Sequence, residues 1–530
     1  MRVLYQLREW FRWPPGRIFA TVLAIALSAV LGVSAWLVYP VVIPPDHPGC
    51  GKGASGVATY GPDHECVGVT DGAYDYAPSY LREVTDRIHA ENRWVTKTKS
   101  PKTVYATVAL MIPMISSSAA EQRQIREEVQ GAYLAQWRAN HQDNSQSPLI
   151  RLVLANPGRA YSQWRPVVTR LAAMARSGRD RLRVVTGFDL SVTDTADAMA
   201  ALANTHGIPL VGGPLTADDF ANTSQRPGRF SNLVRVAPTN SDQANALILF
   251  KPPRPEESLI VEDTRPGDNY IRTLREAFER QIPDAHIEQF QSPDDINDPG
   301  NISNVFTGKL ANICASKAKV IYFAGRPVQL RQFINALGDR ACANPYTVIS
   351  GSNASVLVGD PELGWAKLKK SGITVQYAAL GYPGEWSNRP DLPKTGGSAA
   401  DYAKFDQAVQ EAAEPVGTRS RIGEIYLDDE RTILEYDSVW TGIEEIRTAA
   451  DAGVSMPTLD EVGRARYNLH GTTPVKGASG WICLDNYGNA YDKAVAVIRL
   501  DPAVRGTRLV GIAWPTGSPP PADCTAPRGG

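Results

Sequence analysis

The sequence contains few of the residues on which catalytic and metal centres depend. It has seven histidines and six cysteines among 530 residues. Neither a Gly-x-Ser-x-Gly nucleophile motif nor a His-Glu-x-x-His metal motif occurs. The glycine-rich segment 51–56 lacks the order of a P-loop, and no strand-like run precedes it. The sequence therefore predicts neither enzymatic activity nor a resident cofactor.

A surplus of positive charge is also lacking. Lysine and arginine together number 55, and aspartate and glutamate together number 56, which leaves a net charge of -1. Proteins that bind nucleic acid need basic side chains to neutralise phosphates, so no nucleic-acid partner is expected.

One segment, residues 18–43, contains no charged side chain at all. An α-helix rises about 1.5 Å per residue, so this run is long enough to cross a hydrocarbon layer of roughly 30 Å. Arginines favour the cytoplasmic side of a membrane, and four precede the run: Arg2, Arg8, Arg12 and Arg17. We therefore expect a single-pass cell-membrane protein with a cytoplasmic segment 1–17, a transmembrane helix 18–43 and all later residues outside the cytoplasm.

A cleaved secretory signal is the alternative, because Val33, Ser34 and Ala35 resemble a small-residue cleavage site. The apolar run continues past them through Trp36 and Tyr39, which is longer than such signals usually are. Both interpretations export the bulk of the chain.

The six cysteines form three pairs that are close in sequence: Cys50 with Cys66, Cys314 with Cys342, and Cys483 with Cys524. An oxidising compartment permits disulfides, although six cysteines allow fifteen connectivities. His47 and His64 offer the first pair an alternative as zinc ligands, but their spacing matches no standard zinc site. We expect three local disulfides, the first of them within an extracytoplasmic stalk spanning residues 44–100.

Beyond residue 101 the chain alternates short apolar runs with amphipathic segments. The run 104–111 is uncharged and rich in β-branched residues, as a buried strand requires. Ser118 and Glu121 have the spacing of a capping box, which predicts that a helix begins here. Alternating strands and helices give a parallel sheet that is covered on both faces. The remaining elements of this first set are strands at 150–154, 182–185, 209–211 and 233–236, and helices at 167–175 and 193–205.

A second α/β series follows the Pro252-Pro253 break. It comprises strands at 259–261, 286–290, 320–323 and 347–349, with helices at 270–281, 305–315 and 328–337. About five hundred residues exceed the size at which single cores stop growing, near 250 residues, so two lobes with a cleft between them are expected.

The order of several local motifs resembles the type I periplasmic solute-binding proteins, which include the Leu/Ile/Val-binding proteins of ABC transporters and related receptor ligand-binding domains. The matching segments are 111–115, 129–135, 185–188, 206–211, 215–217, 233–238, 477–481 and 485–489. The resemblance covers the chain from about residue 104 to its end, apart from the insertion 383–420. It implies two Rossmann-like lobes joined by crossing strands, with lobe 1 at about 101–245 and 380–450 and lobe 2 at about 246–375 and 455–530.

In this family the ligand lies between the lobes, and open α/β sheets generally bind ligands beyond the carboxyl ends of their strands. The resemblance therefore implies ligand contacts in the loops after the strands. The candidates in lobe 1 are Ser116, Ser117, Ser191, Thr193, Leu215, Thr216 and Ala217. The candidates in lobe 2 are Asp268, Tyr270, Arg326, Ser352 and Asn353.

Amino-acid binders of the family hold the ligand carboxylate with lobe 1 hydroxyls, which Ser191 and Thr216 match; equally, such residues can simply cap helices. The same binders place a carboxylate after the strand corresponding to 347–349 to hold the ligand's ammonium group, whereas this chain has 350–353 Ser-Gly-Ser-Asn. Arg326 is a candidate partner for an acidic ligand, with a solvated surface charge as the alternative.

The favoured hypothesis is a membrane-anchored protein without catalytic activity that captures a small polar ligand, amino-acid-like or a small acid, for ABC-type uptake or for sensing. The chain carries no permease segments, ATPase motifs or signalling domain, so a separate ABC permease or signalling protein is the expected partner. The alternatives are an envelope protein-interaction module with a vestigial cleft and an envelope enzyme that uses the same cleft.

Overall fold

The computed structural model describes residues 50, 56–97, 104–143, 147–295, 298–386, 392–413, 422–451, 456–469 and 473–526. The expected cytoplasmic segment 1–17 and transmembrane helix 18–43 lie outside these residues. Within the described ranges, none of the helices combines the length and the hydropathy that crossing a bilayer requires.

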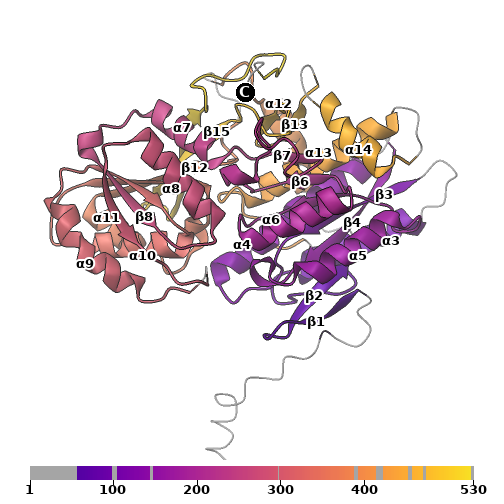
Figure 1. Cartoon of the computed structure of the whole chain (residues 1–530), viewed down its shortest axis with the longest axis horizontal. Coiled ribbons are helices and arrows are strands. Elements are labelled where there is room, and N and C mark those ends of the chain that lie inside the picture. Colours follow the sequence, from indigo (N-terminus) through magenta and orange to yellow (C-terminus); the bar gives the residue numbers. More distant parts are fainter. Residues whose placement is uncertain are drawn as a thin grey trace, which may run out of the picture.

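Two seven-stranded sheets form the centres of two lobes (Figure 1). The lobe 1 sheet has the order β1-β2-β4-β3-β5-β6-β7, and its strands from β4 to β7 are parallel. Its strands are β1 (Val57–Tyr60), β2 (Glu65–Thr70), β3 (Tyr105–Met111), β4 (Leu149–Asn156), β5 (Leu182–Gly187), β6 (Leu210–Gly212) and β7 (Leu233–Arg235).

The lobe 2 sheet has the order β16-β15-β12-β11-β10-β8-β9, in which β15 pairs antiparallel with both β12 and β16 and all other neighbouring strands pair parallel. Its strands are β8 (Ser258–Asp263), β9 (His286–Phe290), β10 (Val320–Ala324), β11 (Tyr346–Ser350), β12 (Ile373–Ala379), β15 (Val495–Asp501) and β16 (Gly506–Ala513). The two predicted α/β series are therefore confirmed, each in its own sheet.

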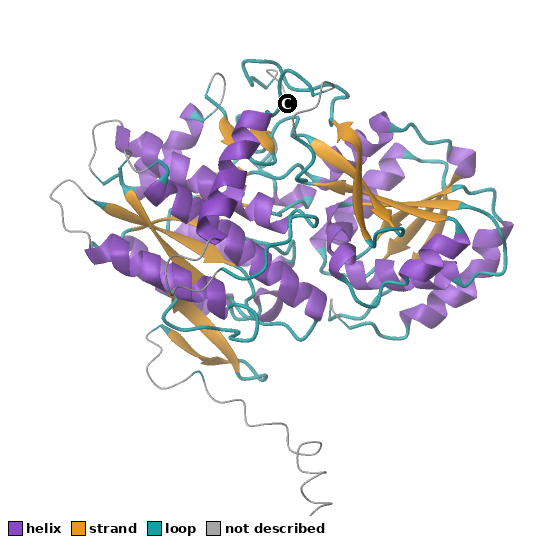
Figure 2. Cartoon of the chain, turned by 180° about the vertical axis from the view of Figure 1, so that it is seen from behind, coloured by secondary structure: helices purple, strands orange, loops and turns teal. Residues whose placement is uncertain are grey.

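Helices cover both faces of each sheet (Figure 2). Alternate residues of β3 show why its sequence is apolar throughout, since Val108 and Leu110 pack in one core and Ala109 and Met111 in another. The lobe 1 helices are α3 (Arg82–Lys97), α4 (Ala119–His141), α5 (Trp164–Arg176), α6 (Thr193–Ala200), α12 (Ala399–Ala413), α13 (Arg431–Asp451) and α14 (Leu459–Ala465). The lobe 2 helices are α7 (Asn240–Phe250), α8 (Asn269–Gln281), α9 (Ile302–Ala315), α10 (Pro327–Gly338) and α11 (Trp365–Ser371).

Three domain boundaries lie at other positions in the structure than the sequence analysis predicted. The described part of the expected stalk supplies β1, β2 and α3 to lobe 1, because β2 pairs with β4 and Ile88 of α3 lies in the lobe core. Helix α7 belongs to lobe 2, where Leu247 is part of the core. The hairpin β13 (Val475–Gly477) and β14 (Gly480–Ile482), like α14, packs against lobe 1, so the last lobe 2 segment begins near β15.

The predicted capping box at the start of α4 is wrong. Ser118 is the N-cap residue, but its hydroxyl accepts no hydrogen bond from the helix. The Ser116 hydroxyl accepts the Ser118 N–H at 3.0 Å and contacts the Glu121 carboxylate. The Glu121 carboxylate that a capping box requires is therefore bound to Ser116 instead of to Ser118, and Ser118 provides no side-chain cap for α4.

The three local cysteine pairs are the disulfides of this structure: Cys50–Cys66, Cys314–Cys342 and Cys483–Cys524. The first disulfide removes two of the zinc ligands considered for that segment. Within the described residues, no group of three or more histidine, cysteine or acidic side chains is arranged to hold a metal ion.

Candidate functional site

A cavity of about 380 Å³ lies between the two lobes. Both lobes line it with loops that follow parallel strands, the position where open α/β sheets bind ligands. Lobe 1 contributes the start of α4, the loop after β5 and the first residue of α13, through Ser117, Ser118, Ala119, Ala120, Glu121, Gln124, Asp189, Leu190 and Arg431. Lobe 2 contributes Pro299, Arg326, Pro327, Val328, Arg331, Asn353, Val356, Asp360, Pro361 and Glu362.

A smaller cavity of about 120 Å³ adjoins the first on the lobe 1 side. The two cavities share Ser117, Glu121, Asp189 and Leu190 as lining residues. Arg159 and Asp295 also line the smaller cavity and form an ion pair between the lobes with a 3.5 Å separation between Nη1 and Oδ2. The two cavities therefore meet at the α4 and β5 loops of lobe 1.

The structure brings four of the predicted site residues to this space. Ser117, Arg326 and Asn353 line the larger cavity, and Ser116 lines the smaller one. The other predicted contacts lie outside both linings: Thr193, Ser191, Leu215, Thr216, Ala217, Asp268, Tyr270 and Ser352.

Ser191 and Thr216 bond within the protein instead. Their exposed fractions are only 3% and 1%. The Ser191 hydroxyl accepts a hydrogen bond from the Ala217 N–H at 3.4 Å. The backbone carbonyl of Ser191 accepts hydrogen bonds from the N–H groups of Asn269 and Tyr270 at the start of α8. The Thr216 carbonyl accepts the Asn240 N–H of α7 at 2.7 Å. These lobe 1 loops thus join directly to lobe 2 helices.

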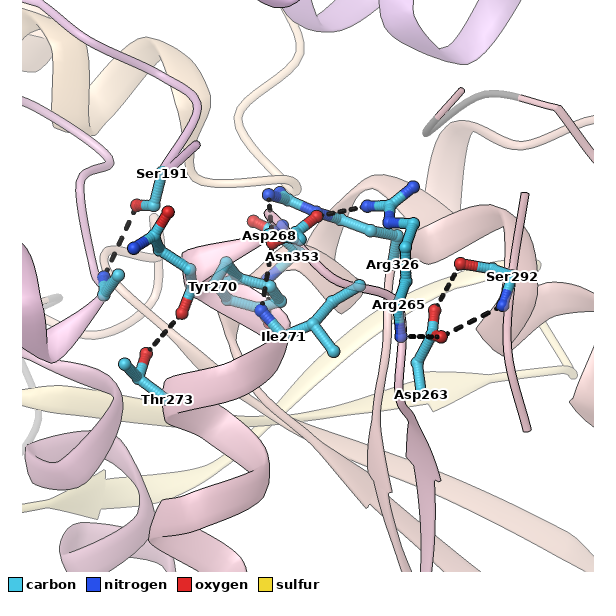
Figure 3. Close-up of polar contacts among 12 residues, drawn as sticks. Ser191, Asp263, Arg265, Asp268, Tyr270, Ile271, Thr273, Ser292, Arg326 and Asn353 are labelled. Atoms are coloured by element: carbon cyan, nitrogen blue, oxygen red, sulfur yellow. Dashed lines mark hydrogen bonds and ion pairs between the residues drawn. The ribbon is translucent and has the colours of Figure 1, made fainter. Parts of the chain in front are cut away.

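Asp268 forms the centre of a buried ion cluster in lobe 2 (Figure 3). Its carboxylate accepts two hydrogen bonds from Arg326, at 2.8 and 2.9 Å, and is also bonded to Arg265. It caps α8 as well, by accepting the Ile271 N–H. Burial opposes ionisation of Asp268, but the Arg326 and Arg265 guanidinium groups outweigh it and keep the pKa of Asp268 below its ordinary value.

The guanidinium group of Arg326 is therefore held in a fixed position. One face stacks over the Tyr270 ring at 4.8 Å, and the Tyr270 hydroxyl accepts the Asn353 N–H at 3.4 Å. The Ser352 N–H is donated to Gln243 of α7. These contacts explain why Tyr270 and Ser352 support the lobe 2 wall without reaching the cavity.

Several solved structures share this architecture. A substrate-binding protein of an ABC transporter from Desulfitobacterium hafniense, complexed with Leu, is 14% identical, with 77% of this chain and 100% of that chain covered and a TM-score of 0.51. A branched-chain amino acid transporter substrate-binding protein from Streptococcus pneumoniae, complexed with isoleucine, is 14% identical, with 78% and 99% covered and a TM-score of 0.52. A solute-binding protein from R. palustris, complexed with 4-hydroxybenzoate, is 14% identical, with 77% and 97% covered and a TM-score of 0.53.

The fold is that of type I periplasmic binding proteins. No protein-family model matches the sequence, and no curated protein matches it. The resemblance identified from the order of the motifs is therefore confirmed at the level of three-dimensional structure.

Sequence reasoning missed the charged residues at the floor of the cleft in this type I fold. Arg431, at the start of α13, bonds to Glu128 of α4 at 3.1 Å and to the Asn353 side chain of lobe 2 at 3.4 Å. Burial raises the pKa of Glu128 to about 7, although Arg431 opposes that shift. Asp189 stands only two residues after β5, so its place at a strand end was a signal that could have found it.

Proposed function

We propose that this chain is a solute-binding protein that captures a small polar ligand between its two lobes and performs no chemistry on it. The cavity between the lobes supports this proposal, because each lobe supplies part of its lining and closure around a ligand would bring the two parts together. Ligand capture would then favour the closed form through its higher affinity for that form.

The neighbours of this fold support a ligand of amino-acid size or a small acid. Their names state complexes with leucine, isoleucine and 4-hydroxybenzoate. In the proposed role the chain passes its ligand to a separate ABC permease, or signals its presence to a separate signalling protein.

We also propose that the protein is anchored by residues 18–43 and works outside the cytoplasm. The uncharged run and the arginines before it support the anchor. Three disulfides support an oxidising compartment. Protease treatment of intact spheroplasts should degrade the large C-terminal part, and complete protection of that part would contradict the proposed orientation.

A melting-temperature screen of the purified full-length protein tests ligand capture. The panel contains amino acids, amides, sugars and aromatic acids such as 4-hydroxybenzoate. A ligand present at one hundred times its Kd should add about 2.7 kcal/mol to the free energy of unfolding. Asn353→Ala should weaken the response, whereas Ser303→Ala, on the exposed side of α9, should leave it unchanged.

A protein-interaction module with a vestigial cleft remains the second candidate. The observation that favours it is the direct bonding of the Ser191 and Thr216 loops to lobe 2 helices. If no compound in the panel raises the melting temperature, and Asn353→Ala behaves like Ser303→Ala throughout, ligand capture is wrong and this second candidate gains support.

A further inference from the structure

The chain passes back and forth between the two lobes. In the part of the chain that the structure describes, it crosses after β7, after β12, between β14 and β15, and after β16. The last crossing differs from the others, because Cys524, which follows β16 of lobe 2, is joined by a disulfide to Cys483. Cys483 belongs to lobe 1, since its neighbours Ile482 and Leu484 pack in the core of that lobe. The C-terminal segment, which lies above the junction of the lobes in Figure 1, is therefore fixed covalently to lobe 1.

This disulfide closes a covalent ring that contains parts of both lobes. The ring runs from Cys483 through β15 and β16 of lobe 2 and back to Cys524, a sequence separation of 41 residues. The other two disulfides of the structure each stay within one lobe. Cys483 and Cys524 are only 1% and 0% exposed, and buried cysteines of this kind are chemically inert. The cross-link is thus a permanent part of the connection between the lobes.

An aromatic cluster packs where the third and fourth crossings meet. Trp514 directly follows β16, and its ring centroid lies 6.5 Å from that of Trp386. Ala494 of the third crossing belongs to the same core. Gly396 lies so close to the Trp514 ring that a Cβ atom would not fit, and its carbonyl accepts the Trp481 N–H of β14 at 2.8 Å. Apolar burial therefore holds the start of the fourth crossing against the lobe 1 hairpin.

Polar contacts fix the same two crossings to lobe 1. Thr516 of the fourth crossing donates its N–H and its hydroxyl to the Asp492 carboxylate of the third, at 3.0 and 2.9 Å. The next residue, Lys493, is buried and donates its ammonium group to the Ser479 carbonyl of lobe 1 at 2.5 Å. The Asp437 carboxylate of α13 faces the same ammonium group. Both crossings therefore form one unit with lobe 1 up to the ends of β15 and β16.

We propose that the C-terminal strut, residues 514–524, limits how far the two lobes separate. Lobe 2 joins the fixed unit through Val495 of β15 and Ala513 of β16, and these two residues are paired with each other. A single strand at a hinge can bend through its own backbone dihedrals. Two paired strands whose ends are both held by lobe 1 have to bend together, which restricts the motion. This restriction does not depend on which ligand the cleft takes.

Three backbone N–H groups report the separation of the lobes. Asn240 is the first residue of α7, and Asn269 and Tyr270 are the first two of α8, so none of the three has a partner within its own helix. Their partners are lobe 1 carbonyls, that of Thr216 for Asn240 and that of Ser191 for the other two. Separation of the lobes exposes these groups to solvent, so their hydrogen-exchange rates measure how often it occurs.

Hydrogen exchange of the full-length protein, read by mass spectrometry, compares two disulfides. Cys483→Ser combined with Cys524→Ser removes the strut disulfide and should accelerate exchange of the three N–H groups by at least about fivefold. Cys314→Ser combined with Cys342→Ser is the matched control, because that disulfide lies within lobe 2. The control should leave the three groups unchanged. Strands β3 and β10, at the centres of the two sheets, should exchange at unchanged rates in both variants.

A milder variant decides the matter if the Cys483 and Cys524 variant does not fold. Thr516→Val, at an exposed position, removes the hydroxyl bond to Asp492 and should accelerate the same three groups by about twofold. Thr525→Val, beyond the disulfide, should change nothing, because Thr525 is bonded to Asp523.

Unchanged exchange of the three groups in the deciding variant would overturn the proposal. Equal acceleration in the lobe 2 disulfide variant would also overturn it, as would acceleration that extends equally to β3 and β10. These measurements use no ligand. Failure of the ligand screen would therefore remove the proposed function and leave the restricted hinge in place.

Discussion

The two sides of the cleft differ in how their charged side chains are paired. On the lobe 2 wall the arginines are paired with carboxylates of their own lobe, Arg326 with Asp268 and Arg331 with Asp360. On the lobe 1 wall the carboxylates outnumber the cations, and Arg431 is shared among several of them. Paired charges fix the shape of a loop, whereas an unpaired buried charge is costly unless a ligand or a proton neutralises it. Lobe 2 therefore holds its side of the cleft through paired charges, whereas the buried carboxyl groups on the lobe 1 side share the cation Arg431.

Asp268→Ala should lower the free energy of unfolding more than any other variant, because it removes the carboxylate that neutralises the arginines on the lobe 2 side of the cleft. The change leaves Arg265 and Arg326 buried without a carboxylate and removes the N-cap of α8. Removing one partner of a buried ion pair costs about 3–5 kcal/mol of stability, and the free energy of unfolding measured in urea should fall by that amount. The exposed pair formed by Asp339 and Lys367 provides the contrast, since Asp339→Ala should cost less than about 1 kcal/mol. Equal costs for the two variants would show that the lobe 2 cluster does not hold this wall together.

The sequence carried enough information to locate most of the strands and helices that build the two sheets. Buried parallel strands need short apolar runs rich in β-branched residues, and the predicted strand 104–111 became β3 at Tyr105–Met111. Helix α13 follows the lobe 2 strands in sequence, and it was the family resemblance that placed its segment, 380–450, in lobe 1. Its apolar pattern says nothing about which lobe it will cover.

The site was less predictable than the fold. Position after a strand selected Ser117, Arg326 and Asn353, which line the larger cavity. The same rule selected Ser191 and Thr216, whose polar groups are instead used between loops and helices of the protein. A sequence does not reveal whether a hydroxyl will face a ligand or a neighbouring loop. Arg431 meets Glu128 across a separation of 303 residues, so no local pattern could have paired them.

The lobe 1 carboxylates should make stability depend on pH. Burial raises the pKa of Glu430 to about 8 and that of Glu128 to about 7, above their ordinary values. A raised pKa in the folded state means that the folded protein holds protons that the unfolded chain has lost. The free energy of unfolding should therefore fall as pH rises from about 4.5 to about 8, by up to about 1.4 kcal/mol per pH unit for each such group.

Glu430→Gln sharpens that prediction, since the amide oxygen can still accept the Leu380 N–H that Glu430 accepts at 2.5 Å. The variant should show a shallower fall of unfolding free energy above pH 6 in urea titrations. Glu256→Gln, an exposed carboxylate of lobe 2, should keep the slope of the unmodified protein. Identical slopes for all three proteins would mean that folding does not raise the pKa of Glu430.

The smallest effect is expected where the two walls meet. Asp219 of lobe 1 lies 2.6 Å from Arg272 of α8 and is also bonded to Asn269, so it ties the lobes together. Arg272 also pairs with Glu276 at 3.1 Å, on its own helix and within lobe 2. Asp219→Ala therefore removes a contact between lobes, whereas Glu276→Ala removes a contact of the same arginine inside one lobe.

Because Arg272 is largely hydrated, the lost contact is worth about 1 kcal/mol, equivalent to roughly a fivefold change in the ratio of closed to open forms. We expect small-angle X-ray scattering to show a larger radius of gyration for Asp219→Ala and an unchanged one for Glu276→Ala. If both variants scatter alike, the contacts that Asp219 makes at the start of α8 do not control closure of the lobes.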